Sequence, residues 1–189
     1  MNALDKDGKD VVVLLAPNGA RGAGHMAILI QNPDGKWALW SKNGTPDNMG
    51  AHGKEGDIKN NPKYHNNRGG SLDGNEYSYQ TIEDFFNSKK DNPIKDGMPE
   101  YTEGYKMSTT KEQDEKARAA IGEELNKDYD VLSSNCAQAV QAALKAAGLN
   151  PGKGLLPKKQ VYPSITKNNP GRFQMFYNTS KRKYYKYKK

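Results

Sequence analysis

The chain has 189 residues, a formal net charge of +7 and a pI near 9.3. Only 34% of its residues are hydrophobic, no apolar run is long enough to span a membrane, and the N-terminus lacks the apolar segment of a signal peptide. The single cysteine excludes an internal disulfide and leaves one thiol for chemistry. This length suits one domain, residues 1–189.

The N-terminal part predicts three strands, the last two of which form a hairpin. Short apolar runs indicate two buried strands, and a third strand returns after an Asn-Pro-Asp-Gly turn. These strands are expected at residues 11–15, 26–30 and 36–41. A glycine-rich loop at 17–24 precedes the second strand, and His25 stands at the point where this loop meets the strand.

Residues 45–100 differ from the rest of the chain. They are rich in Asn, Gly, Asp and Lys and poor in aliphatic residues, and only residues 77–86 are expected to be ordered, with one short helix at 81–86. We interpret 45–100 as a polar insertion. A loop of this length in a compact domain is usually functional, as a lid or as a wall of a binding site.

The C-terminal half predicts strands and helices in alternation. A strand at 101–108 leads to a helix that begins at a Thr110–Gln113 capping box and runs to Leu125. A last strand is expected at 173–177. The basic tail, 178–189, is expected to be mobile and solvated.

Cys136 lies at the start of a predicted helix. Ser133, Ser134 and Asn135 are all suitable N-caps, and Gly148 is a suitable C-terminal stop. One apolar stripe faces the core at helical spacing: Ala137, Val140, Ala143, Leu144 and Ala147. The positive end of the helix dipole favours a thiolate, so we expect Cys136 to be a nucleophile; the alternative is a small buried hydrophobic residue.

A cysteine nucleophile needs a base and a group that orients the base. His25 is the candidate base, although a strand-end histidine bonded to backbone is the structural alternative. Ser41, on the neighbouring strand, is the first candidate for the orienting residue and Asn43 the second. The expected oxyanion donors are the backbone N–H of Cys136 and a nearby group, with Asn135 and Gln138 as candidates.

The other histidines give no second site. His52 and His65 lie in the polar insertion and are expected to face solvent. Three histidines and one cysteine at these spacings do not form a metal-ligand pattern, so neither a metal nor another cofactor is expected.

The positive charge indicates an anionic partner, such as a wall polymer, anionic lipid, nucleic acid or acidic protein. Lysines and tyrosines alternate over residues 181–189, a pattern that could bind nucleic acid by stacking and charge. We disfavour nucleic acid, because such an end is more often a solvated tail.

Three segments resemble the circularly permuted papain-like hydrolases of the NlpC type, and more narrowly the C-terminal toxin domains of Rhs-type polymorphic toxins. The segments are residues 24–30, residues 35–44 and residues 135–148. In this chain His25 precedes Cys136, which is the permuted order. Many relatives carry a second histidine on the next strand; this chain has none there, so Ser41 or Asn43 would take its place, or the site works as a dyad.

The resemblance implies an α+β fold in which a small antiparallel sheet packs against the cysteine helix. It implies Cys136 as nucleophile and His25 as base. It also implies a domain that travels as the tail of a larger secreted chain into a target cell, which would account for the missing signal peptide. A cognate immunity protein is expected that is acidic, to match the +7 charge, and that covers the Cys136 cleft or the insertion.

Several functions remain open from the sequence. The first is an antibacterial effector that cleaves an amide bond in peptidoglycan. A lipid acyl hydrolase or acyltransferase would use the same nucleophile and should show an exposed apolar rim near Cys136, whereas the polar insertion argues against it. A protease or deamidase acting on a target-cell protein is a third enzymatic variant. The alternative outside the enzymes is a basic binding module with an incidental cysteine.

Overall fold

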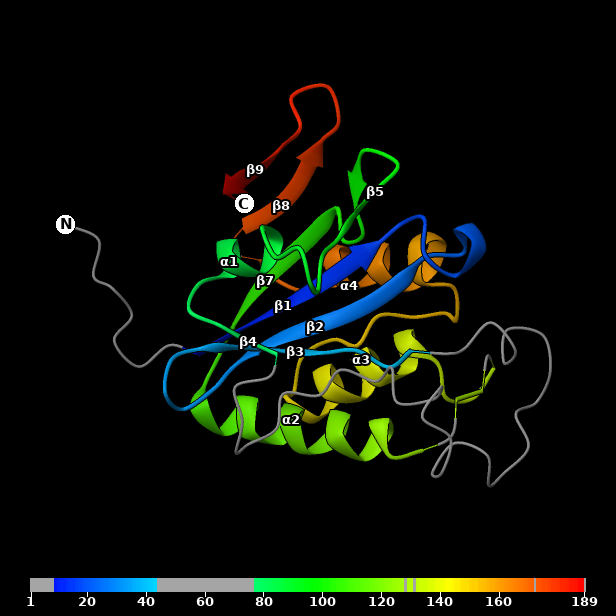
Figure 1. Ribbon diagram of the computed structural model, residues 1–189. Coiled ribbons are helices and arrows are strands. Elements are labelled where there is room, and N and C mark those ends of the chain that lie inside the picture. The colour runs from blue at the N-terminus through cyan, green and yellow to red at the C-terminus, as the bar shows by residue number, and fades with distance from the viewer. Residues whose placement is uncertain (1–8, 44–76, 128, 131, 172, 189) are drawn as a thin grey trace.

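The computed structural model describes residues 9–43, 77–127, 129–130, 132–171 and 173–188 (Figure 1). Its centre is a curled, seven-stranded antiparallel sheet with the strand order β4-β3-β2-β1-β7-β8-β9. Helices cover both faces of the sheet, so the chain has an α+β fold. This agrees with the α+β class that the resemblance implies.

The first three strands form an antiparallel meander and occupy the positions that the sequence predicts. They are β1 (Lys9–Ala16), β2 (His25–Gln31) and β3 (Trp37–Trp40). β2 pairs with β1 from Val11 opposite Ile30 to Ala16 opposite His25. Aliphatic and β-branched residues favour this central position, where both faces are buried. The loop before β2 contains a short 3-10 helix, η1 (Ala20–Gly22).

The remaining strands of the sheet come from distant parts of the chain. They are β4 (Ser78–Tyr79), β7 (Glu103–Thr109), β8 (Phe173–Asn178) and β9 (Lys183–Lys188). β9 occupies the segment that we expected to be a mobile tail, and that expectation is wrong. Residues 183–188 pair with β8 along its whole length, and Tyr187 stacks on Phe176 with ring centroids 4.6 Å apart.

One face of the sheet carries most of the helices. They are α2 (Lys111–Leu125), α3 (Cys136–Ala146), the π-helical turn η4 (Pro157–Val161) and α4 (Tyr162–Asn168). Side chains of α3 pack against the residues of β2 that point to this face, Met26, Ile28 and Ile30. All five residues of the apolar stripe predicted on the Cys136 helix are buried here.

The opposite face is covered by the end of the segment that we interpret as an insertion. The helix α1 (Ile82–Phe86) buries Ile82, Phe85 and Phe86 against this face. Two short strands follow, β5 (Ile94–Lys95) and β6 (Met98–Pro99). Order therefore extends past residue 86, contrary to the prediction, and residues 77–100 contribute to the core. Residues 45–76 of the predicted insertion lie outside the described residues.

The helix ends follow the predicted capping pattern. Thr110 caps α2 and Asn135 caps α3, each in a reciprocal capping box with the residue three positions later. Gly148, with φ of +72°, ends α3 in a Schellman arrangement, since the N–H of Leu149 donates to the Leu144 carbonyl and that of Gly148 to Lys145. The cap thus fixes Cys136 as the first residue of α3. Within the described part of the chain, none of the helices has the length and hydrophobicity to cross a bilayer.

Candidate active site

The Cys136 thiol is buried at the N-terminus of α3. Burial raises its pKa above the usual thiol range, while backbone hydrogen bonds from Met26, Ala137 and Cys136 act in the opposite direction. The backbone N–H groups favour the thiolate, as expected of the helix N-terminus, but loss of hydration is the largest cause and the net shift of the pKa is upward. The raised pKa favours the neutral thiol.

The sulfur of Cys136 lies beside the first residues of β2. The N–H of Met26 that contacts it belongs to the peptide unit joining His25 to Met26. Met26 points to the α3 face of the sheet, whereas Ala27 points to the opposite face. By the alternation of a strand, the His25 side chain starts on the side of the sheet opposite α3. Its ring contacts Ser41 and Tyr101, and the described residues that line the cavity beside the thiol do not include His25.

His25 takes part in a chain of hydrogen bonds with the two predicted orienting residues. Its Nε2 lies 2.9 Å from Ser41 Oγ, and Ser41 Oγ donates to Asn43 Oδ1 at 3.0 Å. Because the Ser41 proton goes to Asn43, Ser41 accepts from His25. In this arrangement Nε2 carries a proton, so in the neutral imidazole the lone pair would lie on Nδ1.

Tyr101 is a member of this site that sequence reasoning missed. Its ring is fully buried, its centroid lies 6.0 Å from that of His25, and its hydroxyl lies 3.3 Å from Ser41 Oγ. No local pattern marks Tyr101, which enters the site through the pairing of β7 with β1. It precedes β7, and Thr102 donates its N–H to the Leu15 carbonyl.

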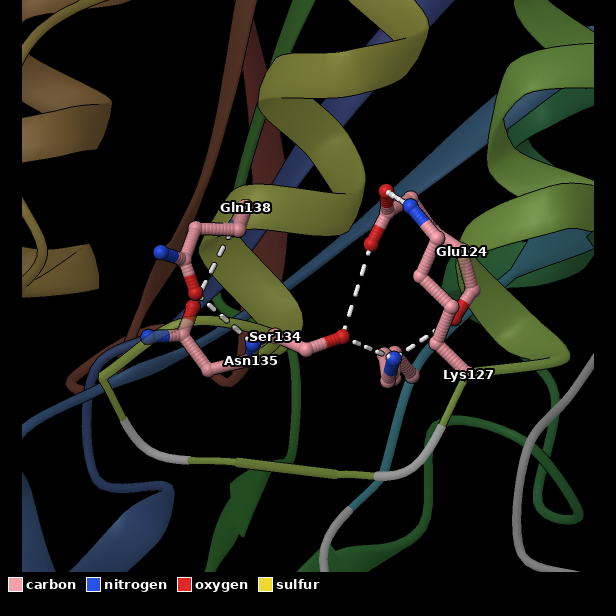
Figure 2. Close-up of polar contacts among 6 residues, drawn as sticks. Glu124, Lys127, Ser134, Asn135 and Gln138 are labelled. Atoms are coloured by element: carbon pink, nitrogen blue, oxygen red, sulfur yellow. Dashed lines mark hydrogen bonds and ion pairs between the residues drawn. The ribbon is translucent and has the colours of Figure 1, made fainter.

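The two side chains proposed as oxyanion donors have structural roles. Asn135 Oδ1 accepts from the N–H groups of Ala137 (2.8 Å) and Gln138 (3.1 Å). Gln138 accepts from the Asn135 N–H through Oε1 at 2.9 Å and donates through Nε2 to the Leu132 carbonyl at 2.8 Å. Gln138 is thereby committed to the cap and to the loop before α3, as Figure 2 shows for the cap.

A buried lysine ties the loop before Cys136 to the neighbouring elements. Lys42 Nζ donates to Ser134 Oγ and to the Glu124 carbonyl, both at 2.5 Å. Ser134 Oγ in turn donates to the Glu124 carboxylate at 3.5 Å, and the same carboxylate forms an ion pair with Lys127 (Figure 2). Lys42, which the sequence analysis did not single out, thus positions the residues that lead into Cys136.

A cavity of about 420 Å³ opens beside the thiol. Its walls come from the η1 loop, the loop before α3 and the start of η4, and we call it the Cys136 cavity. It is lined by Ala20, Ala23, Gly24, Tyr129, Leu132, Asn135, Cys136, Leu155, Leu156, Pro157 and Gln160. None of these lining residues is charged. This volume is within the range of small-molecule sites.

A second, larger hollow of about 710 Å³ lies between α1 and the β8–β9 hairpin. Four cationic side chains line it, Lys89, Arg182, Lys183 and Lys186, beside the single carboxylate of Glu83. We call it the basic groove. It holds neither Cys136 nor His25, so its charge does not act on the thiol at contact distance.

His52 and His65 lie outside the described residues. Comparisons with protein-family models, with curated proteins and with solved structures gave no match.

Proposed function

We propose that this chain is a cysteine hydrolase in which Cys136 is the nucleophile and His25 is the general base. The observation that carries the proposal is the hydrogen-bond chain from His25 Nε2 through Ser41 to Asn43, at the end of β2 where the thiol contacts the His25–Met26 peptide. Acyl transfer by a cysteine requires a base beside the nucleophile and a third group that orients the base.

The reaction follows from the protonation states. His25 Nδ1 takes the proton of the Cys136 thiol as the sulfur attacks the acyl carbonyl, and a tetrahedral intermediate forms. His25 returns the proton to the leaving group as the bond to the carbonyl carbon breaks, which leaves a thioester. Water, deprotonated by His25, then attacks the thioester, and the free acid and the thiol are released.

The raised thiol pKa is compatible with this scheme. A neutral Cys–His pair transfers its proton during the attack and does not have to exist as an ion pair beforehand. The backbone N–H groups that contact the sulfur, above all that of Met26, stabilise the negative charge as it forms. The backbone N–H of Cys136 remains the first candidate for holding the oxyanion.

We further propose that the fold is the permuted papain-like fold of NlpC-type hydrolases and that the chain acts as a toxin domain of a Rhs-type secreted protein. The support is the order of the elements, with the His25 strand ahead of the Cys136 helix, and the packing of that helix on an antiparallel sheet. The protein would be carried into a target cell on its parent chain.

Peptidoglycan, cleaved at an amide bond, is the substrate that the sequence favours, and the net charge of +7 supports binding to an anionic wall. The test is a digest of purified peptidoglycan with the wild-type protein and Cys136→Ala, read by mass spectrometry. New fragments from the wild type alone are expected of a wall amidase. Absence of fragments from a folded protein would exclude this substrate.

The nucleophile is tested separately by alkylation with a small reagent such as iodoacetamide. We expect His25→Ala to slow alkylation of Cys136, since the base no longer takes the proton. Equal rates in the wild type and in His25→Ala would contradict the pair and favour a binding module with an incidental cysteine.

An acidic immunity protein remains the proposed partner. The basic groove supports a docking place for it, because four cations and one carboxylate are among the described residues that line it, whereas none of the described residues that line the Cys136 cavity is charged. Co-purification with the product of the neighbouring reading frame tests the partner. Replacing Lys183 and Lys186 by Glu should weaken the complex if the groove is the contact.

A further inference from the structure

The last two strands carry a row of aromatic rings on one face. Phe176 of β8 stacks with both Tyr185 and Tyr187 of β9, with ring centroids 6.2 and 4.6 Å apart and interplanar angles of 27° and 10°. Phe176 and Tyr185 are half-buried, whereas Tyr187, at one end of the row, is 50% exposed. The row therefore ends in a ring that a further planar group can reach. We call these three residues the ring platform.

The ring platform lies on a part of the sheet that the helices leave open. Phe173 and Met175 of β8 pack with the core cluster around α1, so the alternation of the strand places Phe176 on the opposite face. The β8–β9 hairpin projects from the sheet beyond α3 and α4, which cover that face elsewhere (Figure 1). Among the described residues, neither core cluster includes the three rings of the platform.

The hairpin that carries the ring platform is strongly basic. Residues 173–188 contain five cationic side chains and no carboxylate. In the described part of the chain, Lys186 is the one of the five that forms an ion pair, with Glu83 at 3.9 Å. Lys183 lies on the ring face, since its Nζ is 5.0 Å from the centroid of Tyr185. All five cations are exposed: Lys181, Arg182, Lys183, Lys186 and Lys188.

Glu103 of β7 does not cancel this charge. It lies on the same face of the sheet, opposite Phe176 in the pairing of β7 with β8. Its half-buried carboxylate accepts a hydrogen bond from the Gln174 side chain and lies near the cation of Lys158. The Glu103 charge is therefore matched by partners of its own, and the hairpin cations remain in excess.

The hairpin loop holds two of these cations in a fixed backbone. Asn178 pairs with Lys183, so residues 179–182 form the loop, and the N–H of Lys181 donates to Asn178 Oδ1 at 2.9 Å. Arg182 has a φ of +50°, in the left-handed region that glycine adopts at lower cost. A long cationic side chain is thus kept at a position whose backbone favours glycine, and strain of this kind marks candidate functional positions.

We infer that the β8–β9 hairpin binds single-stranded nucleic acid. A base stacks on the exposed ring of Tyr187, and the phosphates lie beside Lys183 and the cations of the loop. An unpaired strand offers both chemistries together, because every base has a π-face and every phosphate carries a negative charge. A double helix keeps its bases stacked inside, and an acidic protein satisfies the cations without using the rings.

This binding function goes beyond the proposed hydrolase and does not depend on Cys136. The reason for disfavouring nucleic acid, a solvated tail, does not hold for residues 183–188, because they form the strand β9. Tyr187 is not among the described residues that line the basic groove, so substitutions of Tyr187 separate this surface from the site proposed for the acidic partner.

The test is the fluorescence anisotropy of a labelled oligodeoxythymidylate of about 15 nucleotides, with polyphosphate of similar length as a competitor without bases. We expect the wild type to bind the oligonucleotide, with log K falling linearly as log of the KCl concentration rises. Tyr187→Ala should weaken binding of the oligonucleotide about fivefold or more and leave the affinity for polyphosphate unchanged. Tyr187→Phe keeps the ring and should keep both affinities.

Arg182→Gly separates binding from folding. Glycine relieves the left-handed backbone, so the urea midpoint should stay the same or rise, whereas the slope of log K against log salt should fall by about 0.7 because one phosphate contact is lost. Lys145→Gln, at an exposed lysine of α3, is the control and should leave the slope unchanged. An unchanged slope in Arg182→Gly, or an equal fall in both variants, would overturn the inference.

The remaining outcomes also decide the matter. Absence of oligonucleotide binding by the folded wild type at low salt overturns the inference. So does an unchanged affinity in Tyr187→Ala, or an equal loss for the oligonucleotide and for polyphosphate, since charge alone would then account for binding. Displacement of the oligonucleotide by soluble peptidoglycan glycan, with the same dependence on Tyr187, overturns nucleic acid and assigns the ring platform to sugars. None of these results bears on the reactivity of Cys136.

Discussion

Ser41 and Lys42 are adjacent at the end of β3. Ser41 contacts the candidate base, His25, and Lys42 contacts the segment that leads to the candidate nucleophile. Ser41 Oγ lies 2.9 Å from His25 Nε2, and Lys42 Nζ lies 2.5 Å from Ser134 Oγ, two residues before Cys136. Successive side chains of an extended segment point to opposite faces, so one strand end can position base and nucleophile together. A shift of this dipeptide would move both groups.

Removal of the Ser41 hydroxyl should lower the rate without unfolding the protein. Ser41→Ala leaves His25 Nε2 without its oxygen partner, and loss of such a bond, worth about 1–3 kcal/mol, corresponds to a fall in kcat of about fivefold to 150-fold. Tyr101→Phe is the matched control, since it removes the other hydroxyl near Ser41 and keeps the ring. Steady-state kinetics measures both, and an equal fall in the two variants would argue against an orienting role specific to Ser41.

Lys42→Met should destabilise the fold. The substitution removes an ammonium donor from the part-buried Glu124 carbonyl and from the buried Ser134 Oγ, so we expect the free energy of unfolding to fall by about 1–3 kcal/mol. Lys127→Met is the control, because Lys127 also binds Glu124 but is exposed to solvent, and its ion pair contributes little. Urea denaturation compares the two variants; similar losses would contradict a special role for the buried lysine.

Gly19→Ala should displace His25. A Cβ at residue 19 would lie 2.6 Å from the His25 Cβ, closer than carbon atoms approach, so the imidazole would have to move away from Ser41. We expect activity to fall at least tenfold, as small misplacements of reacting groups are costly. Gly122→Ala, whose nearest neighbour is 4.0 Å away, should keep full activity. Retained activity in Gly19→Ala would show that activity does not depend on the position of the His25 side chain.

Alkylation of Cys136 should depend on pH with a midpoint above that of an ordinary thiol, about 8.5. The reason is burial, which raises the pKa of the folded thiol. The same protein in denaturant, where the thiol is hydrated, provides the reference titration. A folded midpoint at or below the denatured one would mean that the helix N-terminus outweighs burial.

The same shift has a consequence for stability. Since the folded pKa of Cys136 lies above the unfolded one, the unfolded chain releases its proton first as pH rises. The contribution of the thiol is fully present below a pH of about 8.5 and is lost as pH rises through the folded pKa. Denaturation from pH 7 to 10 should show a smaller alkaline loss in Cys136→Ala than in the wild type, and parallel curves would contradict this.

The local elements could be predicted from the sequence because their signals are local. Apolar runs define β1 and β2, a capping box defines the start of α2, and Asn135 with Gly148 defines both ends of α3. His25, Ser41 and Asn43 were accessible for the same reason, since neighbouring strands of a short meander bring residues 16 positions apart into contact.

Tertiary structure decided the rest, because contacts between distant segments leave no local pattern. The tail became strand β9 by pairing with β8, and Tyr101 and Lys42 joined the site through partners 60 and 92 positions away. The pKa of the Cys136 thiol also depends on contacts between distant segments. Backbone N–H groups of its own helix and of β2 lower the pKa, whereas burial raises it, and burial is the larger cause.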